Sequence, residues 1–202
     1  MSYVYSVLAG IGDTAGFSKA ADDWGIDHVL GLGAKHFTAS EIVMGGELSG
    51  SVVIGFEYET VDAAMEGQAG LYADGKTVQL MQETQVQVIR RNLFRLQAEV
   101  GSRTGNYGTI LYAAGPPVDD ATAQQNLDIN WSHMENGANG IMSLMSVASG
   151  PAPFTGTAVT SADSLDSLLA ASEAMFADEE IRSMMASSGL SILGRVITRR
   201  LF

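Results

Sequence analysis

Three histidines are the only side chains in the sequence whose ordinary pKa lies near neutrality, so they are the first candidates for proton transfer. His28 follows Trp24 by four residues in a helical pattern, and His133 follows Trp131 by two in another. His36 stands at the start of a strand pattern. His28 or His133 could accept a proton or bind a haem at the rim of a pocket. The alternative is that both lie on helix surfaces or at helix ends.

Four arginines form two matching pairs. Arg91 and Arg95 share one face of a predicted strand, and Arg195 and Arg199 share the equivalent face of a later one. Guanidinium groups at matching places could hold a substrate carboxylate or enolate. The alternative is an exposed strand edge, or ion pairs with glutamates on neighbouring strands.

Aromatic side chains supply the remaining candidates. Phe56 and Tyr58 alternate on a predicted strand, where a tyrosine pointing into an apolar pocket could bind a phenol or quinone. Such residues are also ordinary core residues, and the same alternative holds for both tryptophans. We predict catalytic roles for His28, Tyr58 and Arg91. We predict substrate-binding roles for Trp24, His36, Phe56, Arg95, Trp131, His133 and Arg195.

Other chemistries find no support in the sequence. It has no cysteine, which removes disulfides, thiolate nucleophiles and cysteine-based zinc sites. The histidines lack the spacing of metal-binding helices, so we predict no metal site and no cofactor. The segment Gly10-Ile11-Gly12-Asp13 lacks the third glycine of a dinucleotide-binding loop, and no Gly-x-Ser-x-Gly motif occurs.

The composition indicates a packed globular protein, with 46% hydrophobic and 17% charged residues among 202. The net charge of −12 repels phosphate backbones and anionic lipid, so neither nucleic acid nor a membrane is a predicted partner. No apolar run is long enough to cross a bilayer, and residues 1–5 do not resemble a secretory signal. We therefore expect a cytoplasmic protein that binds a small molecule.

The chain contains an internal repeat with an offset of 104 residues. Gly33 then falls on Gly137, and Arg91 falls on Arg195. The helical spacing of apolar residues also agrees: Val61, Ala64, Met65 and Tyr72 fall on Leu165, Leu168, Leu169 and Phe176. This agreement predicts two structural units, residues 1–99 and 106–202, joined by a linker at 100–105.

Each copy predicts the order strand, helix, strand, strand, helix, strand, as in a ferredoxin-like βαββαβ unit. In the first copy, strands are expected near 3–9, 40–44, 51–59 and 85–96, with helices from Asp13 or Thr14 and from Thr60. In the second, strands are expected near 107–114, 141–148, 155–160 and 190–201, with helices from Asp119 or Asp120 and from Ser164.

Gly45-Gly46-Glu47, Gly50-Ser51-Val52-Val53, Tyr72-Ala73-Asp74 and the ending at 177–185 carry a resemblance to a known group. The sequence resembles the dimeric α+β barrel superfamily, which includes the antibiotic-biosynthesis-type (ABM) monooxygenases and the NIPSNAP, EthD and muconolactone-isomerase-like proteins. Members usually pair two identical chains. The resemblance implies that two tandem ferredoxin-like units form an intramolecular pseudo-dimeric α+β barrel, as a monomer or as a further homodimer.

A four-stranded sheet with helices on one side leaves its other face bare, and two such faces bury one another. We expect a small ligand to sit between the two sheets, with at most one site per chain, in the first half. The resemblance implies a cofactor-independent monooxygenase or isomerase acting on a small aromatic or polyketide-like molecule. The alternatives are a non-catalytic, ligand-binding or stress-associated barrel with a filled lumen, and a haem-binding barrel. The small third-strand residues Thr155, Thr157 and Thr160 favour a filled interior for the second half.

Overall fold

The computed structural model describes residues 2–202, which fold into one closed barrel of eight antiparallel strands. The strands are β1 (Ser2–Gly10), β2 (His36–Met44), β3 (Ser51–Tyr58), β4 (Gln87–Gly101), β5 (Tyr107–Ala114), β6 (Gly140–Ala148), β7 (Gly156–Ala162) and β8 (Ser191–Arg200). Their order around the barrel is β1-β3-β2-β8-β5-β7-β6-β4. This is the predicted pseudo-dimeric α+β barrel, built within a single chain.

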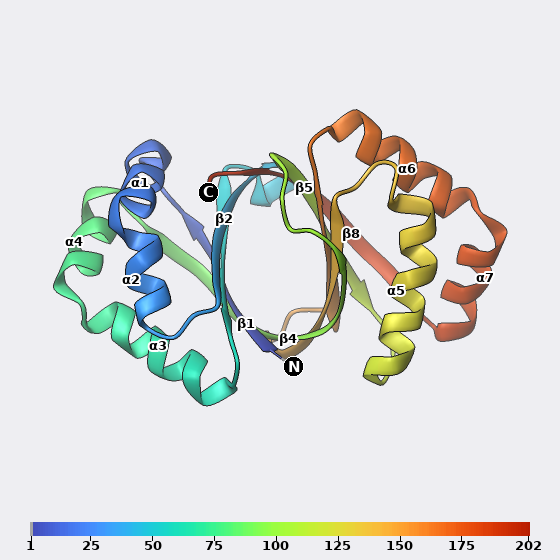
Figure 1. Ribbon diagram of the computed structural model, residues 1–202, viewed down its shortest axis with the longest axis horizontal. Coiled ribbons are helices and arrows are strands. Elements are labelled where there is room, and N and C mark those ends of the chain that lie inside the picture. Colours follow the sequence, from blue (N-terminus) through green and yellow to red (C-terminus); the bar gives the residue numbers. More distant parts are fainter. Residues whose placement is uncertain (1) are drawn as a thin grey trace.

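Helices cover the outside of the barrel on two opposite sides (Figure 1). The helices are α1 (Thr14–Ala20), α2 (Ile26–Gly31), α3 (Val61–Ala73), α4 (Gly75–Glu83), α5 (Asp120–Met134), α6 (Leu165–Ala177) and α7 (Glu179–Ser188). We call β1–β4 with α1–α4 the first half, and β5–β8 with α5–α7 the second half. Each half has the predicted βαββαβ order, and its helices pack on the outer face of its own sheet.

Two seams join the halves. Strand β2 pairs with β8, and β4 pairs with β6, so each half contributes two strands to the seams. The space enclosed by the strands, the lumen, contains apolar side chains from both halves. One such cluster consists of Leu8, Ile42, Ile110 and Val196. The inner faces therefore bury one another, as the bare-face argument predicted.

The helices begin at matched capping residues. The hydroxyl of Thr60 accepts a hydrogen bond from the backbone N–H of Ala63, and Ser164 does the same at the equivalent position of α6. The carboxylates of Asp74 and Asp178 cap α4 and α7 in the same way. The predicted caps Thr60 and Ser164 are confirmed, and both pairs keep the offset of 104 residues.

The first helical region departs from the predicted regular helix. Residues Ala21–Gly25 form a π-helical segment between α1 and α2, whereas the corresponding α5 is a continuous α-helix. A π-helical segment accommodates an extra residue and rotates the next turn of the helix, and such segments are frequent at functional sites. No helix within residues 2–202 is long and apolar enough to cross a membrane.

A buried ionic network lies close to the linker between the halves. Arg103 forms an ion pair with Glu57, and its Nε and second terminal nitrogen donate to Glu99 at 2.5 and 2.7 Å. Ser2 donates to the other oxygen of Glu57 at 2.5 Å. Burial alone raises the pKa of Glu57, but the bonds and charge of Arg103 and the bond from Ser2 outweigh it and lower that pKa.

Glu57→Gln tests this network. Because the folded-state pKa lies below the unfolded value, the carboxylate stabilises the fold above the unfolded pKa, and this contribution is lost as the pH falls through the folded pKa. We expect the variant to lose about 2 kcal/mol of unfolding free energy at neutral pH, because Arg103 keeps Glu99. Its unfolding free energy should also decline less on acidification below about pH 5. Urea unfolding followed by circular dichroism measures both effects.

Glu59→Gln is the matched control, because the Glu59 side chain is 73% exposed and its one ion pair within residues 2–202 is with Lys35. It should leave both the neutral stability and the acid dependence close to wild type. Equal acid dependence in wild type and Glu57→Gln would show that the buried carboxylate does not carry this charge-linked stability.

Candidate functional site

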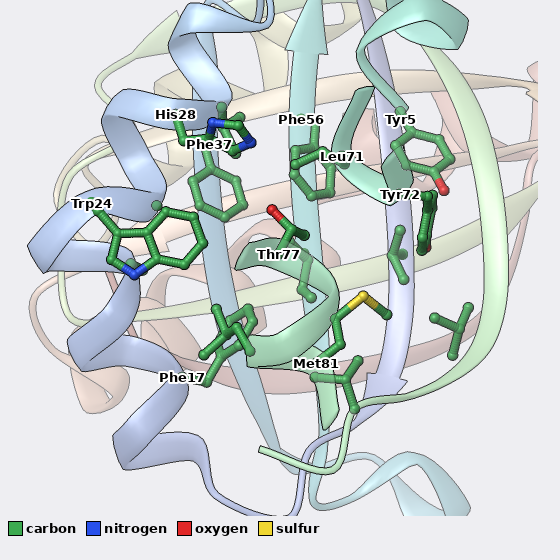
Figure 2. A pocket seen from close by; sticks show the side chains of 18 residues that line it. Tyr5, Phe17, Trp24, His28, Phe37, Phe56, Leu71, Tyr72, Thr77 and Met81 are labelled. Atoms are coloured by element: carbon green, nitrogen blue, oxygen red, sulfur yellow. The ribbon is translucent and has the colours of Figure 1, made fainter. Parts of the chain in front are cut away.

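The first-half pocket is a cavity of about 90 Å³ between the sheet of the first half and its helices (Figure 2). Tyr5, Phe37 and Phe56 line it from the strands, and Leu71, Thr77 and Met81 line it from α3 and α4. The pocket therefore lies on the outer face of the sheet. Our expectation that Phe56 would face the space between the two sheets is wrong, because alternate strand residues point to opposite faces and Phe56 points to the helices.

The π-helical segment brings two predicted residues to this pocket. Trp24 and His28 both line it, and their ring centroids lie 5.8 Å apart. The Lys76 ammonium group lies 4.0 Å from the centroid of the Trp24 ring. Trp24 thus contacts both a cation from α4 and the imidazole of α2. Figure 2 shows Trp24 and His28 at one side of the pocket.

His28 has an unusual environment for a histidine. Its Nε2 is buried and makes no hydrogen bond within residues 2–202, and the nearest carboxylate oxygen, Oδ2 of Asp74, is 3.7 Å away. Asp74 itself accepts bonds from the backbone N–H and the hydroxyl of Thr77, at 2.7 and 2.9 Å. These bonds, first that from the backbone, lower the pKa of Asp74. An ionised carboxylate therefore stands beside an imidazole whose buried Nε2 has no hydrogen-bond partner among residues 2–202.

A second polar group lies at the other edge of the pocket. The Arg91 guanidinium donates to the Tyr72 hydroxyl at 3.0 Å, and the Tyr5 hydroxyl lies close to both. That buried hydroxyl makes no well-aligned hydrogen bond within residues 2–202. Burial, together with the nearby Tyr72, raises the pKa of Tyr5 to about 12. Tyr5 therefore keeps its proton at neutral pH and can donate it to an oxygen in the pocket.

Tyr72, Asp74 and Thr77 were missed as site residues in the sequence. They lie at the end of α3 and the start of α4, where the sequence showed only a helix end. The motif Tyr72-Ala73-Asp74 was visible, but its position against the sheet depends on how the two helices pack.

Tyr58 does not line the pocket. Its side chain is fully buried against α3, and a Cβ atom added at Gly67 would lie 2.3 Å from the Tyr58 hydroxyl oxygen. That hydroxyl has no hydrogen-bond partner among residues 2–202, and burial raises its pKa. This placement argues against the predicted catalytic role and makes Tyr58 a core residue.

Four other predicted residues lie outside the first-half pocket. His36 lies opposite Glu57 on neighbouring strands and lines the lumen. Arg95 forms an ion pair at 2.7 Å with Asp120 of α5, and not with one of the glutamates that the ion-pair alternative expected. Trp131 packs in the core of the second half, and His133 is half-buried near the end of α5. The structure thus brings Trp24, His28 and Phe56 together in one lining, places Arg91 beside it on Tyr72, and leaves these four elsewhere.

A larger cavity lies in the second half. It occupies about 450 Å³ between strands β5–β8 and helices α5–α7. Arg195 is exposed at its rim and donates to the hydroxyl of Ser172 at 2.7 Å. Five methionines provide adaptable apolar lining, namely Met134, Met145, Met175, Met184 and Met185.

Side-chain size at matched positions explains the difference in volume. Strand pairing keeps the offset of 104 residues, since Tyr3 lies opposite Tyr58 and Tyr107 lies opposite Ala162. At four matched outer positions a bulky aromatic ring in the first half is replaced by a smaller side chain in the second: Tyr5 by Thr109, Phe37 by Ile141, Phe56 by Thr160 and Tyr58 by Ala162.

The filled interior expected for the second half concerns the lumen, whereas this cavity lies on the outer face of the sheet. The small residues Thr157 and Thr160 of β7 line an open cavity, because no larger side chain from α5–α7 fills the space they leave. A third cavity, of about 130 Å³, lies in the lumen. Within residues 2–202, no group of three or more His, Cys, Asp or Glu side chains is arranged to hold a metal ion.

No protein-family model matches the sequence, and no curated protein matches it. Solved structures do match its shape over nearly the whole chain. A candidate monooxygenase from Fusobacterium nucleatum subsp. nucleatum gives a TM-score of 0.61 at 11% identity, covering 100% of this chain and 93% of that one. The candidate chlorite dismutase TA0507 gives 0.59 at 10% identity, covering 98% and 94%. The chain has the dimeric α+β barrel fold.

An anthrone oxidase-like protein shares this dimeric α+β barrel fold, with a TM-score of 0.55 at 10% identity over 98% of this chain and 90% of that one. At such identities the likeness concerns the path of the backbone. The side chains that decide chemistry are those of this chain alone. The outer pockets of this dimeric α+β barrel must therefore be judged by their own volume, charge and hydrogen bonding.

Tyr58→Phe separates a core role from a catalytic one. Removing a buried hydroxyl that has no partner within residues 2–202 should leave the unfolding free energy unchanged, or raise it by up to about 1 kcal/mol. Tyr58→Ala should lose about 3–5 kcal/mol, because it also removes the ring that fills the space against Gly67. Urea unfolding of both variants makes the comparison. A loss of more than about 1 kcal/mol in Tyr58→Phe would mean that the hydroxyl has a stabilising partner after all.

Proposed function

We propose that the protein binds a small molecule with an apolar body and an anionic group in the second-half cavity. The observation that carries this proposal is the cavity of about 450 Å³ with a mainly apolar wall. An engineered apolar cavity of about 150 Å³ is large enough to bind benzene. By that measure the second-half cavity has room for several rings or a medium-length chain, whereas the first-half pocket of about 90 Å³ is smaller than a one-ring site.

Arg195 would recognise the anionic group. Its only hydrogen bond to residues 2–202 goes to the neutral Ser172, and it forms no ion pair with a carboxylate there. A guanidinium that is not neutralised presents further N–H donors to the cavity, in a planar arrangement that suits a carboxylate.

The same cavity lacks groups for acid–base catalysis. Among residues 2–202, its lining contains no His, Asp or Glu. Arginine is too weak an acid to exchange a proton near neutral pH. We therefore favour a non-catalytic, ligand-binding barrel over an enzyme for this cavity. In this version of that alternative the ligand occupies an open outer cavity.

A haem does not fit either outer cavity of the described chain. The second-half cavity has the room but is lined by no histidine, and His133 lies outside its lining. The first-half pocket has His28 but a volume of only about 90 Å³. Neither outer cavity of the described chain therefore combines a histidine ligand with enough space for a haem.

Thr109→Phe tests the binding proposal. Thr109 is buried on β5 and lines the cavity where the first half has Tyr5, so an aromatic ring there should fill part of the space without disturbing the lumen. Anilinonaphthalenesulfonate, an apolar fluorophore with one anionic group, should bind wild type, and Thr109→Phe should weaken this binding by about tenfold or more. Fluorescence titration of the folded protein measures the effect.

Two further variants sharpen this test. Thr104→Phe adds the same ring at an exposed linker position and should bind like wild type. Arg195→Gln should weaken displacement of the fluorophore by naphthoate about tenfold while leaving naphthamide nearly unaffected, because only the carboxylate needs the guanidinium. If Thr109→Phe binds the fluorophore as wild type does, the second-half cavity is not the binding site.

A second candidate function belongs to the first-half pocket. We propose that His28 accepts a proton from a small carbon acid or phenol there, as the first step of a cofactor-independent isomerase or oxygenase. The observation that favours this is the buried Nε2 of His28, without a hydrogen bond to residues 2–202 and next to the ionised Asp74. Tyr5 can donate to the oxygen that becomes negative. The candidate monooxygenase among the structural neighbours supports this second proposal only by analogy of fold.

His28→Asn tests the second candidate. Acetylacetone is small and has an acidic C–H bond, so the rate at which solvent deuterium enters its central carbon reports proton abstraction. Wild type should accelerate this exchange, and the variant should lose about 10²-fold or more of that acceleration. His133→Asn, outside both outer cavities, should retain it. Equal acceleration by wild type and His28→Asn would exclude His28 as the base.

A further inference from the structure

The lumen contains a cation without a counter-charge among residues 2–202. Arg90 points into it from β4 and lines the lumen cavity of about 130 Å³. Its Nε is buried and makes no hydrogen bond, and no carboxylate of the described chain forms an ion pair with it. It contacts the ring of Phe154, whose centroid is 5.3 Å from the guanidinium carbon. A buried guanidinium N–H without an acceptor is costly unless something occupies it.

Asn92 stands next to Arg90 on the same face of β4. It is 6% exposed, lines the same cavity, and its Oδ1 has no hydrogen-bond partner among residues 2–202. Alternate residues on a strand are about 7 Å apart. A buried acceptor and a buried cation are therefore separated by roughly the length of a molecule with four or five heavy atoms.

The strand paired with β4 places neutral or apolar side chains opposite Arg90 and Asn92. Two further cations, Arg103 and Arg200, line the same cavity, and Arg200 donates to the backbone oxygen of Arg103. Across the paired strands, Leu8 lies opposite Arg90 and Ser6 lies opposite Asn92. Phe154 packs at 5.1 Å from the ring of Tyr112, and the nearby positive charge of Arg90 partly offsets the rise that burial causes in the pKa of Tyr112. The carboxylate that lines the lumen cavity, Glu57, is already paired with Arg103.

From this geometry we propose that the lumen holds a small oxyanion that also carries a hydrogen-bond donor, with its negative oxygens on Arg90 and its donor on Asn92. A short hydroxycarboxylate has this chemistry, and so does a protonated inorganic oxyanion such as hydrogenphosphate. The cavity has room for several water-sized groups, which limits the ligand to this size class. Leu144, Thr157 and Thr160 line both this cavity and the second-half cavity, but Arg90 and Asn92 line only the lumen cavity. Variants of these two residues therefore test this proposal apart from the ligand proposed for the second half.

Two pairs of anions test the two parts of the proposal, the negative charge on Arg90 and the donor on Asn92. Glycolate and hydrogenphosphate carry a donor, whereas acetate and sulfate are close analogues without one at neutral pH. Glycolate and hydrogenphosphate should shift the Nε–H resonance of Arg90 in nitrogen-15 spectra, and each should bind about tenfold or more tightly than its analogue in calorimetry. The relative affinities of the two donor-bearing anions distinguish an organic ligand from an inorganic one.

Two variants assign the groups. Arg90→Lys keeps the charge but not the planar set of donors, and should weaken all four anions by about tenfold. Asn92→Leu keeps the size but not the acceptor, and should reduce the preference for glycolate over acetate to about one. Arg199→Gln changes an exposed arginine on the outer face that pairs with Glu41, and should leave all four affinities unchanged.

The outcomes are decisive in both directions. The proposal is supported if the preference for a donor-bearing anion depends on Asn92 and the affinity depends on Arg90, in variants that keep wild-type circular dichroism and urea midpoints. It is overturned if none of the four anions moves the Arg90 Nε–H resonance, which would leave water as the occupant, or if Arg199→Gln weakens binding as much as Arg90→Lys.

Discussion

The closure of two four-stranded sheets over one lumen is the constraint on which the remaining structure depends. Each sheet has its outer face covered by its own helices, so its inner face would meet water if the half stood alone. The two seams, β2 with β8 and β4 with β6, satisfy the backbone of the outermost strands and close the barrel. Because both seams form within one chain, a single polypeptide supplies both sheets of the barrel.

Closure also separates three interior spaces that can vary independently. Each outer cavity depends on the side chains of one half, whereas the lumen depends on both. Replacing Phe56 by the equivalent Thr160 enlarges an outer cavity without touching the seams. The two halves therefore differ both in cavity volume and in the polar side chains at the cavity. The first half combines His28, Asp74 and Tyr5 with little space, and the second combines ample space with Arg195, a cation that no described carboxylate neutralises.

The fold was largely predictable because the same helix caps and the same apolar spacing occur in both halves of the sequence. The caps Thr60 and Ser164 and the helical spacing after each of them recur at one offset, as a doubled unit predicts. The π-helical segment was not predictable, since the spacing of Phe17, Trp24 and His28 also fits a regular helix. The insertion depends on how the helix packs against the sheet.

The site was predictable only in part, for reasons visible in single residues. Strand alternation shows that Phe56 and Tyr58 share a face, but it cannot tell which face meets helices and which meets the lumen. Nor can it show that Gly67 lets α3 approach Tyr58 and seal it into the core while Phe56 remains at a cavity. His28 and Trp24 were found because helical spacing places them on one face. Tyr72 and Thr77 were missed because their role arises from the packing of two consecutive helices.

The distribution of charge explains how an acidic protein can hold unpaired arginines inside. With a net charge of −12, the surface repels anions at long range, but salt screens this repulsion beyond about 8–10 Å. Attraction to Arg90 acts over a few ångströms in a partly desolvated interior, where a charged hydrogen bond is much stronger than at the surface. The exterior therefore discriminates against extended polyanions that must lie along it, while the interior favours single small anions that can enter. Size and desolvation, more than net charge, decide which anions this chain can bind.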